Sequence, residues 1–274
     1  MSDPRTLSGL QALLARHGLS PRKALGQHFL VDKNLFSYIV RAARVRPGEP
    51  VFEVGPGPGG LSLSLVEAGA DLTAIERDKR LAPLLKEVLG DRARLVFTDA
   101  LHYPWEEVPA GSLFVANLPY NIGTPLVLRL LESGRFRDLL VMLQREVADR
   151  FTAQPGSRDY GPIALKVQEL ARVEKLRDVP PSVFYPPPEV TSALVRLTPK
   201  GIPPDPGYFR FLDAAFRTRR KTLRRNLEAA GYDRRRIEAA LSELGLDPKV
   251  RAEALAPGAL KTLYARLGGP DSTR

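Results

Sequence analysis

One stretch decides the fold of this chain: Val51-Phe52-Glu53-Val54-Gly55-Pro56-Gly57-Pro58-Gly59-Gly60. Apolar residues alternate with an acid, glycines follow, and an apolar helical pattern begins at Leu61. This order predicts a buried strand, a tight turn and the start of a helix. Glycines suit such a turn because they reach positive φ and let the backbone approach a ligand. The helix start beyond them offers unpaired N–H groups, so the stretch predicts a nucleotide-binding turn in an α/β fold.

The glycine spacing fits two classes of binding turn. Gly55, Gly57 and Gly60 match the dinucleotide fingerprint. Gly59 in place of Gly60 instead gives the acid-x-Gly-x-Gly-x-Gly turn of S-adenosylmethionine methyltransferases. In both classes Glu76 ends the next strand, where a carboxylate can accept hydrogen bonds from two ribose hydroxyls. A purely structural glycine turn in another α/β protein is a third interpretation, so other segments must discriminate.

Length and composition limit the class of protein. The 274 residues suffice for one large domain and a smaller one. No apolar run reaches the ~18 residues of a membrane span, and no apolar signal-peptide core is seen, so we expect a cytoplasmic protein without a membrane partner. The chain has no cysteine, which excludes disulfides, and only three scattered histidines. We therefore expect no metal site, and we expect a monomer.

The placement of charge suggests a polyanionic partner. The net charge is +10, and it divides into +5 over residues 1–50, −1 over 51–204 and +6 over 205–274. A near-neutral middle with two basic ends is typical of a protein that grips a nucleic acid at its flanks. The alternative is solvated charge that only favours solubility.

From residue 51 the chain alternates predicted strands and helices, as a doubly wound, Rossmann-like parallel sheet requires. Residues 199–207 contain four prolines and two glycines and are the predicted linker. The predicted domains are therefore 1–204, a sheet domain with a basic N-terminal extension, and 205–274, a small all-helical domain. Ligands of open α/β sheets bind at the carboxyl ends of the strands. The residues predicted at those ends are Gly55, Glu76, Asp99 and Asn117.

The motif Asn117-Leu118-Pro119-Tyr120 discriminates between the classes. The exocyclic amine of a base is a poor nucleophile because its lone pair is delocalised into the ring. An amide oxygen and the Leu118 carbonyl can accept its two protons and favour a tetrahedral nitrogen, with Pro119 fixing the turn. Tyr120 can stack on a base removed from its helix. An ordinary Asn-Pro turn is the alternative, disfavoured by the glycine turn and acidic strand ends before it.

Several motifs together make the chain resemble a known family, the ribosomal RNA adenine dimethyltransferases. The resemblance is closest to the bacterial small-subunit (16S) enzymes whose loss gives kasugamycin resistance, and it covers nearly the whole chain. It implies an S-adenosylmethionine methyltransferase sheet with a helical RNA-binding domain. The matching stretches are Lys23 to Leu30, the glycine turn, Glu76-Arg77-Asp78, Thr98-Asp99-Ala100, Asn117 to Ile122, Gln144 to Ala148, Phe184 to Pro188, Ala215-Phe216 and Arg219 to Leu223.

The resemblance also implies roles for individual residues. His28 and Leu30 would close over the cofactor, Gly55 with Gly57 would approach its methionine part, and Glu76 would take its ribose hydroxyls. Asp99 with Ala100 would bind the cofactor's adenine, and Asn117 would bridge cofactor and target amine. Phe184 would be a second stacking partner for the target adenine, with core packing as its alternative.

The same resemblance assigns RNA contacts to the basic ends. Their alternative is a solvated helix face. The N-terminal candidates are Arg22 and Lys23, and the C-terminal candidates, expected on two helical turns, are Arg219, Arg220, Lys221 and Arg224.

The sequence thus predicts an enzyme that dimethylates two adjacent adenosines in the 3′-terminal hairpin of 16S rRNA during assembly of the small subunit. A large-subunit methyltransferase of the macrolide-resistance type is the nearest alternative. A nicotinamide dehydrogenase fits only the glycine turn and Glu76, and it leaves residues 117–120 without a role. A non-catalytic RNA-binding assembly factor is the last alternative, disfavoured by the intact acidic strand ends.

Overall fold

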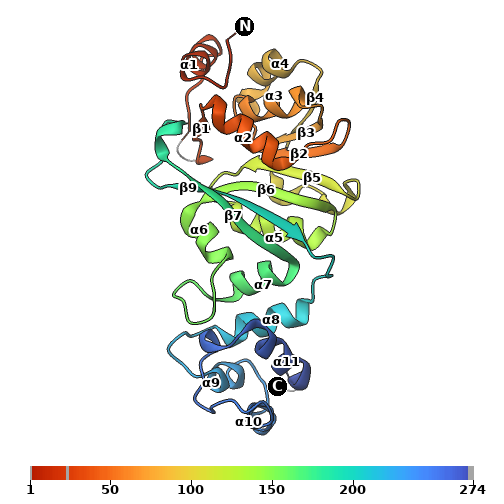
Figure 1. Ribbon diagram of the computed structural model, residues 1–274, viewed down its shortest axis with the longest axis vertical. Helices are drawn as coiled ribbons and strands as arrows, with labels where there is room; N and C mark the ends of the chain where they lie inside the picture. Colours follow the sequence, from red (N-terminus) through yellow and green to blue (C-terminus); the bar gives the residue numbers. More distant parts are fainter. Residues whose placement is uncertain (1, 23–24, 271–274) are drawn as a thin grey trace. The chain divides into compact units, whose positions relative to one another are not determined.

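The computed structural model describes residues 2–22 and 25–270 of the chain. It divides into two compact units (Figure 1). The sheet unit comprises Met1–Ala148 and Ala171–Gly201, and the helical unit comprises Asp149–Leu170 and Ile202–Arg274.

The sheet unit contains a seven-stranded sheet in the order β4-β3-β2-β5-β6-β9-β7. The first five strands of that order run parallel, and β9 and β7 join antiparallel at the edge. This confirms the predicted α/β class. The strands are β2 (Pro50–Val54), β3 (Asp71–Glu76), β4 (Ala93–Phe97), β5 (Ser112–Asn117), β6 (Phe136–Gln144), β7 (Ala171–Val179) and β9 (Ser192–Pro199).

The strand order places the predicted ligand edge at the middle of the sheet. Strand β2 lies between β3 and β5, and the chain order reverses there. A crevice forms beyond the carboxyl ends of the strands at such a switch point. Gly55 directly follows β2 and Asn117 ends β5, so the structure brings these two strand ends together.

Helices cover the sheet and bury its apolar residues. Asp32 caps α2, since its carboxylate accepts from the Leu35 N–H at 2.8 Å. Helices α2 and α3 pack over strands β2, β3, β5 and β6 in one buried cluster. Helix α1 packs on α4 in a second cluster. The helices are α1 (Leu7–Arg16), α2 (Lys33–Ala43), α3 (Gly60–Glu67), α4 (Ala82–Leu89) and α5 (Gly123–Ser133), with short 3₁₀ turns η2 (Lys79–Leu81), η3 (Ala100–His102), η4 (Trp105–Glu107) and η5 (Pro181–Val183).

A small second sheet joins two segments that are distant in sequence. Strand β1 (Phe29–Leu30) pairs antiparallel with β8 (Phe184–Tyr185), and Leu30 lies opposite Phe184. Two-residue strands carry too little pattern to predict. The pairing fixes the segment before α2 against the proline-rich turn at 186–188.

The helical unit contains no strand among its described residues, as predicted. It holds the end of α6 (Arg145–Phe151) and the helices α7 (Pro162–Leu170), α8 (Pro206–Ala215), α9 (Leu223–Glu228), α10 (Arg234–Glu243) and α11 (Pro257–Leu267), with a 3₁₀ turn η6 (Ala252–Ala254).

The division into units falls at 201/202, three residues before the expected boundary at 204/205, and it also differs in one internal segment. Residues 149–170 belong to the helical unit, although they stand between two strands of the sheet in sequence. The Tyr160 hydroxyl donates to the Leu255 carbonyl at 2.9 Å, and its ring packs edge-on to Phe216. Lys166 pairs with Asp213 at 2.7 Å. These contacts are non-local, so no local sequence pattern reports them.

Among the described residues, no helix is long and apolar enough to cross a membrane.

Candidate functional site

One pocket in the sheet unit gathers almost every predicted site residue. Phe184 is the exception among those assigned to the cofactor or the reaction centre. The predicted residues that line the pocket are His28, Leu30, Gly55, Gly57, Glu76, Asp99, Ala100, Asn117, Leu118, Pro119 and Tyr120. They come from segments between residues 28 and 120, so the fold and not the local sequence assembles the site.

The glycine turn has the backbone that its sequence predicts. Gly55 and Gly57 have φ of 70° and 54°, in the left-handed region that favours glycine. A Cβ on Gly55 would stand 3.2 Å from the Pro119 ring, and one on Gly57 would stand 2.9 Å from the Phe29 ring. The turn is therefore held between the 117–120 segment on one side and β1 on the other.

Glu76 is a buried carboxylate at the end of β3. It is 7% exposed. Its two oxygens accept hydrogen bonds from the Gly57 N–H at 3.3 Å and the Asp78 N–H at 2.8 Å. Burial raises the pKa of Glu76, and the hydrogen bonds from Asp78 and Gly57 oppose the rise. The glycine turn and the predicted ribose acceptor are thus directly bonded to one another.

Glu53 is a second buried acid, beneath the glycine turn. It is 1% exposed, and the Ser62 hydroxyl donates to its carboxyl at 2.5 Å. Burial raises the pKa of Glu53 to about 8, the Ser62 hydrogen bond lowers it, and the nearby Glu76 raises it further. At pH 7 the Glu53 carboxyl is therefore mostly protonated in the folded protein.

This pKa predicts a pH dependence of stability. The folded state holds the Glu53 proton up to pH about 8, whereas the unfolded chain releases it near its ordinary pKa of 4.5. The contribution to stability is therefore complete below pH 4.5 and is lost as the pH rises toward 8. We expect Glu53→Gln to remove that loss, which amounts to about 2 kcal/mol between pH 6 and pH 8.

Urea unfolding of the wild type and Glu53→Gln at both pH values measures this effect. Ser62→Ala is the matched control, because it removes the hydrogen bond but keeps the titrating carboxyl. If Glu53→Gln shows the same pH dependence as the wild type, Glu53 is not the buried acid that titrates.

Asp99 and Ala100 form a polar corner of the pocket after β4. The Asp99 carboxylate accepts from the Leu101 N–H at 2.9 Å, and its second oxygen lies 3.9 Å from the Arg77 guanidinium. The Ala100 carbonyl accepts from the buried indole N–H of Trp105 at 2.8 Å. These bonds hold the turn η3 in place, so the Asp99 carboxylate is fixed at the pocket wall.

Asn117 is oriented by the backbone of a distant segment. Its side-chain Nδ2 donates to the His28 carbonyl at 3.3 Å. An amide that donates through nitrogen turns its oxygen to the other side. Among the described residues, no donor is paired with Asn117 Oδ1 or with the Leu118 carbonyl. The pocket therefore contains two acceptors that are held in place and available.

Tyr120 is anchored at both its ring and its hydroxyl. The ring stacks with the His28 imidazole at 5.8 Å between centroids, and the hydroxyl bonds to the Ser192 hydroxyl at 2.7 Å. His28 Nδ1 bonds in turn to the Pro186 carbonyl at 2.8 Å. Burial raises the pKa of Tyr120, with an opposing effect from Ser192. The sequence predicts a stacking role for the Tyr120 ring, and the structure adds a hydrogen bond through its hydroxyl.

Phe184 does not line the pocket. It is 4% exposed and belongs to the cluster beneath α2, where the β1–β8 pairing places it opposite Leu30. The structure therefore favours core packing, the alternative to the predicted stacking role.

Of the predicted C-terminal basic residues, Arg219, Arg220 and Lys221 lie in a loop, and Arg224 lies on helix α9. Residues 216–222 connect α8 and α9. Arg219 pairs with Glu253 at 3.2 Å and donates to the Arg158 carbonyl, and Arg224 pairs with Glu238 at 2.8 Å. These two therefore stabilise the helical unit. Arg220 and Lys221 are exposed, and the described residues contain no side-chain partner for either.

At the N-terminal end, Arg22 is exposed and Lys23 lies outside the described residues. The Arg22 N–H donates to the side chain of Gln27 at 2.8 Å, and Gln27 donates to Asp78 at 3.1 Å. Although burial raises the pKa of Asp78, hydrogen bonds from Arg80 and Gln27 lower it below its ordinary value. The basic N-terminal loop is thus bonded to the segment after β3.

Sequence reasoning missed four residues at the site. Gln27 and Asp78 each belong to a stretch that matches the family. Neither stretch alone indicates that the two side chains are hydrogen-bonded to each other. Ser192 is 72 residues from Tyr120, and only the pairing of β9 beside β6 brings it near. Pro4 also lines the pocket, and no pattern in the sequence indicates it.

The described residues contain no group of three or more His, Cys, Asp or Glu side chains that could hold a metal ion.

Comparisons with known proteins identify the family. The family model described as ribosomal RNA adenine dimethylase matches residues 18–267. A Deinococcus radiodurans protein named ribosomal RNA small subunit methyltransferase A is 44% identical over 265 residues, which cover 94% of this chain and 90% of that protein.

Two solved structures are similar. A dimethyladenosine transferase from Plasmodium falciparum superposes with a TM-score of 0.72 at 24% identity, covering 87% of this chain and 98% of that one. The 23S rRNA methyltransferase ErmE superposes with a TM-score of 0.65 at 29% identity, with the same coverage of 87% and 98%. The methyltransferase family and fold imply S-adenosylmethionine as the methyl donor. The chain therefore belongs to the ribosomal RNA adenine dimethylase family.

Proposed function

We propose that the protein transfers methyl groups from S-adenosylmethionine to the 6-amino groups of two adjacent adenosines in the 3′-terminal hairpin of 16S rRNA. The products are dimethyladenosines, formed on the assembling small subunit. The protein would act in the cytoplasm and as a monomer. The observation that carries the proposal is the Asn117 amide, held by the His28 carbonyl in the same pocket as Glu76.

The pocket fits S-adenosylmethionine by the chemistry of its residues. Glu76 offers a buried carboxylate for the two ribose hydroxyls. Gly55 and Gly57 leave out side chains where a ligand would approach the backbone. Asp99 offers an acceptor for the cofactor's adenine amine. When bound, the cofactor supplies an electrophilic methyl group on a sulfonium.

The residues at 117–118 act on the target amine. Its two protons are donated to Asn117 Oδ1 and the Leu118 carbonyl, both of which are available acceptors. Two acceptors at fixed positions favour a tetrahedral amine nitrogen. The lone pair of that nitrogen is then no longer delocalised into the ring and can attack the methyl group. Each transfer would form one N–C bond as the S–CH3 bond of the sulfonium breaks, leaving a neutral thioether, and one amine proton would pass to solvent. Positioning therefore supplies most of the rate enhancement that this chain's residues provide.

Tyr120 provides the stacking surface for the target base. His28 stacks with its ring, so the base is expected on the other side. Base–aromatic stacking is worth ~1–3 kcal/mol by alanine substitution. The Ser192 bond fixes the plane of the ring before the base arrives.

The small subunit is favoured over the large subunit as the substrate. Relatives that are 38–45% identical over nearly the whole chain carry the name ribosomal RNA small subunit methyltransferase A. The 23S rRNA methyltransferase ErmE is more distant, at 29% identity. Mapping of methylated adenines in the rRNA of a strain lacking this gene tests the choice. We expect two adjacent adenosines of 16S rRNA to lose methylation, and a change confined to 23S rRNA would favour the alternative.

The exposed basic residues between α8 and α9 carry the RNA-binding part of the proposal. Replacing Arg220 and Lys221 together by alanine should weaken RNA binding and lower the log–log salt slope by ~0.7–0.9 per lost phosphate contact. Filter binding at several salt concentrations measures the slope.

The matched control is Arg234→Ala, an exposed arginine of the same unit that pairs with Glu238 at 2.9 Å. It should leave the slope unchanged. Arg219→Ala should instead lower the stability of the helical unit, because Arg219 is bonded within it. An unaltered salt slope in the Arg220/Lys221 variant would mean that these two side chains are only exposed to solvent and do not contact RNA phosphates.

A further inference from the structure

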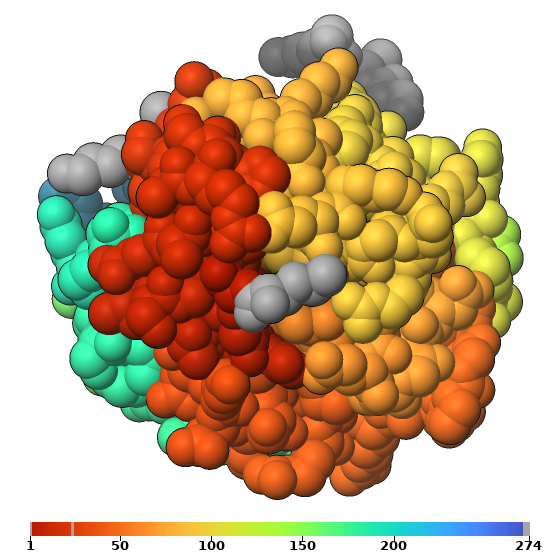
Figure 2. All heavy atoms as spheres, turned by 90° about the horizontal axis from the view of Figure 1, so that it is seen from above, coloured from red at the N-terminus to blue at the C-terminus, as the bar shows by residue number. Residues whose placement is uncertain are grey.

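The N-terminal strap, residues 2–17, is a part of the sheet unit that the family does not explain. The family match begins at residue 18. Helix α1 within the strap buries Leu10, Leu13 and Leu14 against Leu84 and neighbouring residues of α4. Figure 2 shows the red N-terminal atoms lying against the orange and yellow segments that follow in the chain. The strap is therefore packed onto the methyltransferase sheet unit.

The start of the strap reaches the cofactor pocket. Pro4 is buried and lines the pocket together with the glycine turn. The chain doubles back there, since the Thr6 N–H and hydroxyl both donate to the Asp3 carbonyl, at 3.2 and 3.1 Å. A Cβ on Gly9 would stand 2.1 Å from the Asp3 carbonyl oxygen. The reversal thus needs glycine at position 9, and it delivers Pro4 to the pocket wall.

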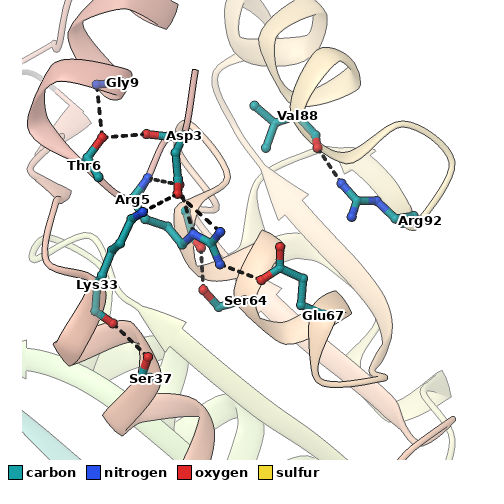
Figure 3. A network of polar contacts seen from close by, with 11 residues as sticks. Asp3, Arg5, Thr6, Gly9, Lys33, Ser37, Ser64, Glu67, Val88 and Arg92 are labelled. Atoms are coloured by element: carbon teal, nitrogen blue, oxygen red, sulfur yellow. Dashed lines mark hydrogen bonds and ion pairs between the residues drawn. The ribbon is translucent and has the colours of Figure 1, made fainter. Parts of the chain in front are cut away.

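Asp3 fixes this reversal to the helices beside the pocket (Figure 3). Its carboxylate accepts from Arg5 Nε at 2.9 Å and pairs with Lys33 of α2 at 2.9 Å. Arg5 also pairs with Glu67, the last residue of α3, at 2.6 Å. Helix α3 begins at the glycine turn. The charges of the strap therefore connect it to α2 and α3, each of which follows a pocket-lining segment.

The network is partly shielded from solvent. The side chains of Asp3 and Arg5 are 26% and 21% exposed. Burial raises the pKa of Asp3, but hydrogen bonds from Arg5 and Lys33 lower it well below its usual range. The Asp3 carboxylate thus stays charged at neutral pH. Salt, which screens exposed ion pairs, is therefore the condition that weakens the network near pH 7.

The far end of the strap is anchored separately. Arg16 and His17 both contact Glu87 of α4, at 2.5 and 2.8 Å. Loss of the Asp3 carboxylate would therefore loosen residues 3–5 while α1 stays in place, since Arg5 keeps Glu67 and Ser2 still accepts from Arg16 at 2.9 Å.

We propose that residues 2–6 of the strap form a wall of the cofactor pocket and slow the exchange of S-adenosylmethionine and its demethylated product. Asp3 is the positioning residue, and Pro4 is the group that closes the wall. The proposal rests on the proposed function, because it takes the ligand of the pocket to be S-adenosylmethionine. Because Pro4 lines the pocket, loss of the wall removes a contact with the bound ligand, and such losses appear mainly in the dissociation rate.

The test compares Asp3→Ala and Pro4→Gly with the wild type. The affinity for S-adenosylhomocysteine is measured by calorimetry, and the dissociation rate of radiolabelled S-adenosylmethionine by rapid filtration after a chase. We expect dissociation to be ~5–10-fold faster in both variants, equivalent to about 1–1.4 kcal/mol. Added salt should speed release from the wild type and have little effect on Asp3→Ala. Lys86→Ala is the control, since the Lys86 ammonium on α4 has Asp91 as its only ion-pair partner within the described part of the chain.

Two results would contradict the proposed pocket wall, and a third would contradict the proposed function. Equal dissociation rates in the wild type and both variants would overturn the wall. A lower melting temperature with unchanged release would give the strap a structural role alone and would also overturn it. A wild type that binds neither compound would instead contradict the proposed function.

Discussion

Replacing Asn117 by alanine lowers the single-turnover rate of methyl transfer ~10²–10³-fold and leaves RNA affinity nearly unchanged. The reason is that Asn117 Oδ1 accepts from an amine that must become tetrahedral as the methyl group arrives. The His28 carbonyl holds the Asn117 amide before any substrate binds. Its contribution is therefore realised mainly in the transition state. Rapid-quench methyl transfer to small subunits, with filter binding alongside, separates the two effects.

Tyr120 variants provide the comparison for that result. Tyr120→Ala should weaken binding of the target RNA through a lost stacking contact of ~1–3 kcal/mol. Tyr120→Phe keeps the ring but loses the bond to Ser192, which is worth ~0.5–1.5 kcal/mol in a typical case. Ser192→Ala removes the same bond and should match Tyr120→Phe. Near-normal turnover in Asn117→Ala, or a Tyr120→Phe defect as large as that of Tyr120→Ala, would refute the assigned roles.

Glu76→Ala weakens binding of S-adenosylmethionine by ~1–3 kcal/mol, since hydrogen bonds from two ribose hydroxyls to a charged acceptor are lost. Glu76 also accepts from the Gly57 N–H, so its removal loosens the glycine turn. Glu76→Gln keeps an acceptor oxygen and should lose less affinity than Glu76→Ala. Calorimetry measures both. NADH should not bind to the wild type. Tight binding of NADH without binding of S-adenosylmethionine would support the alternative that the protein is a nicotinamide dehydrogenase.

The sheet and most of the pocket were predictable because each depends on local signals. A buried strand followed by glycines fixes the turn at 55–59. Glu76 and Asn117 each end a strand, and Asp99 follows the end of β4 by two residues. Parallel strands bring their carboxyl ends to one edge, so local positions predict a shared site. The residues lining the pocket agree with that reasoning.

The structure departs from the predictions where contacts between residues distant in sequence determine the position or the partners of a side chain. Phe184 is buried because β8 pairs with β1, and neither two-residue strand has a periodic pattern. Arg219 and Arg224 stay predicted RNA contacts, but each also pairs with an acidic residue of the helical unit that the sequence did not indicate. Residues 149–170 join the helical unit through Tyr160 and Lys166, although they stand between strands. The charge of a residue and its position in the sequence do not determine its contact partner, because that partner comes from a distant part of the chain.

The most direct test of the central claim uses the purified protein, isotopically labelled S-adenosylmethionine and ribosomal subunits that lack adenine dimethylation. Mass spectrometry of the isolated rRNA then locates the label. We expect four labelled methyl groups on two adjacent adenosines of the small-subunit rRNA, formed ~10²–10³-fold more slowly by Asn117→Ala. Label on large-subunit rRNA, or no label on adenine in either subunit, would contradict it.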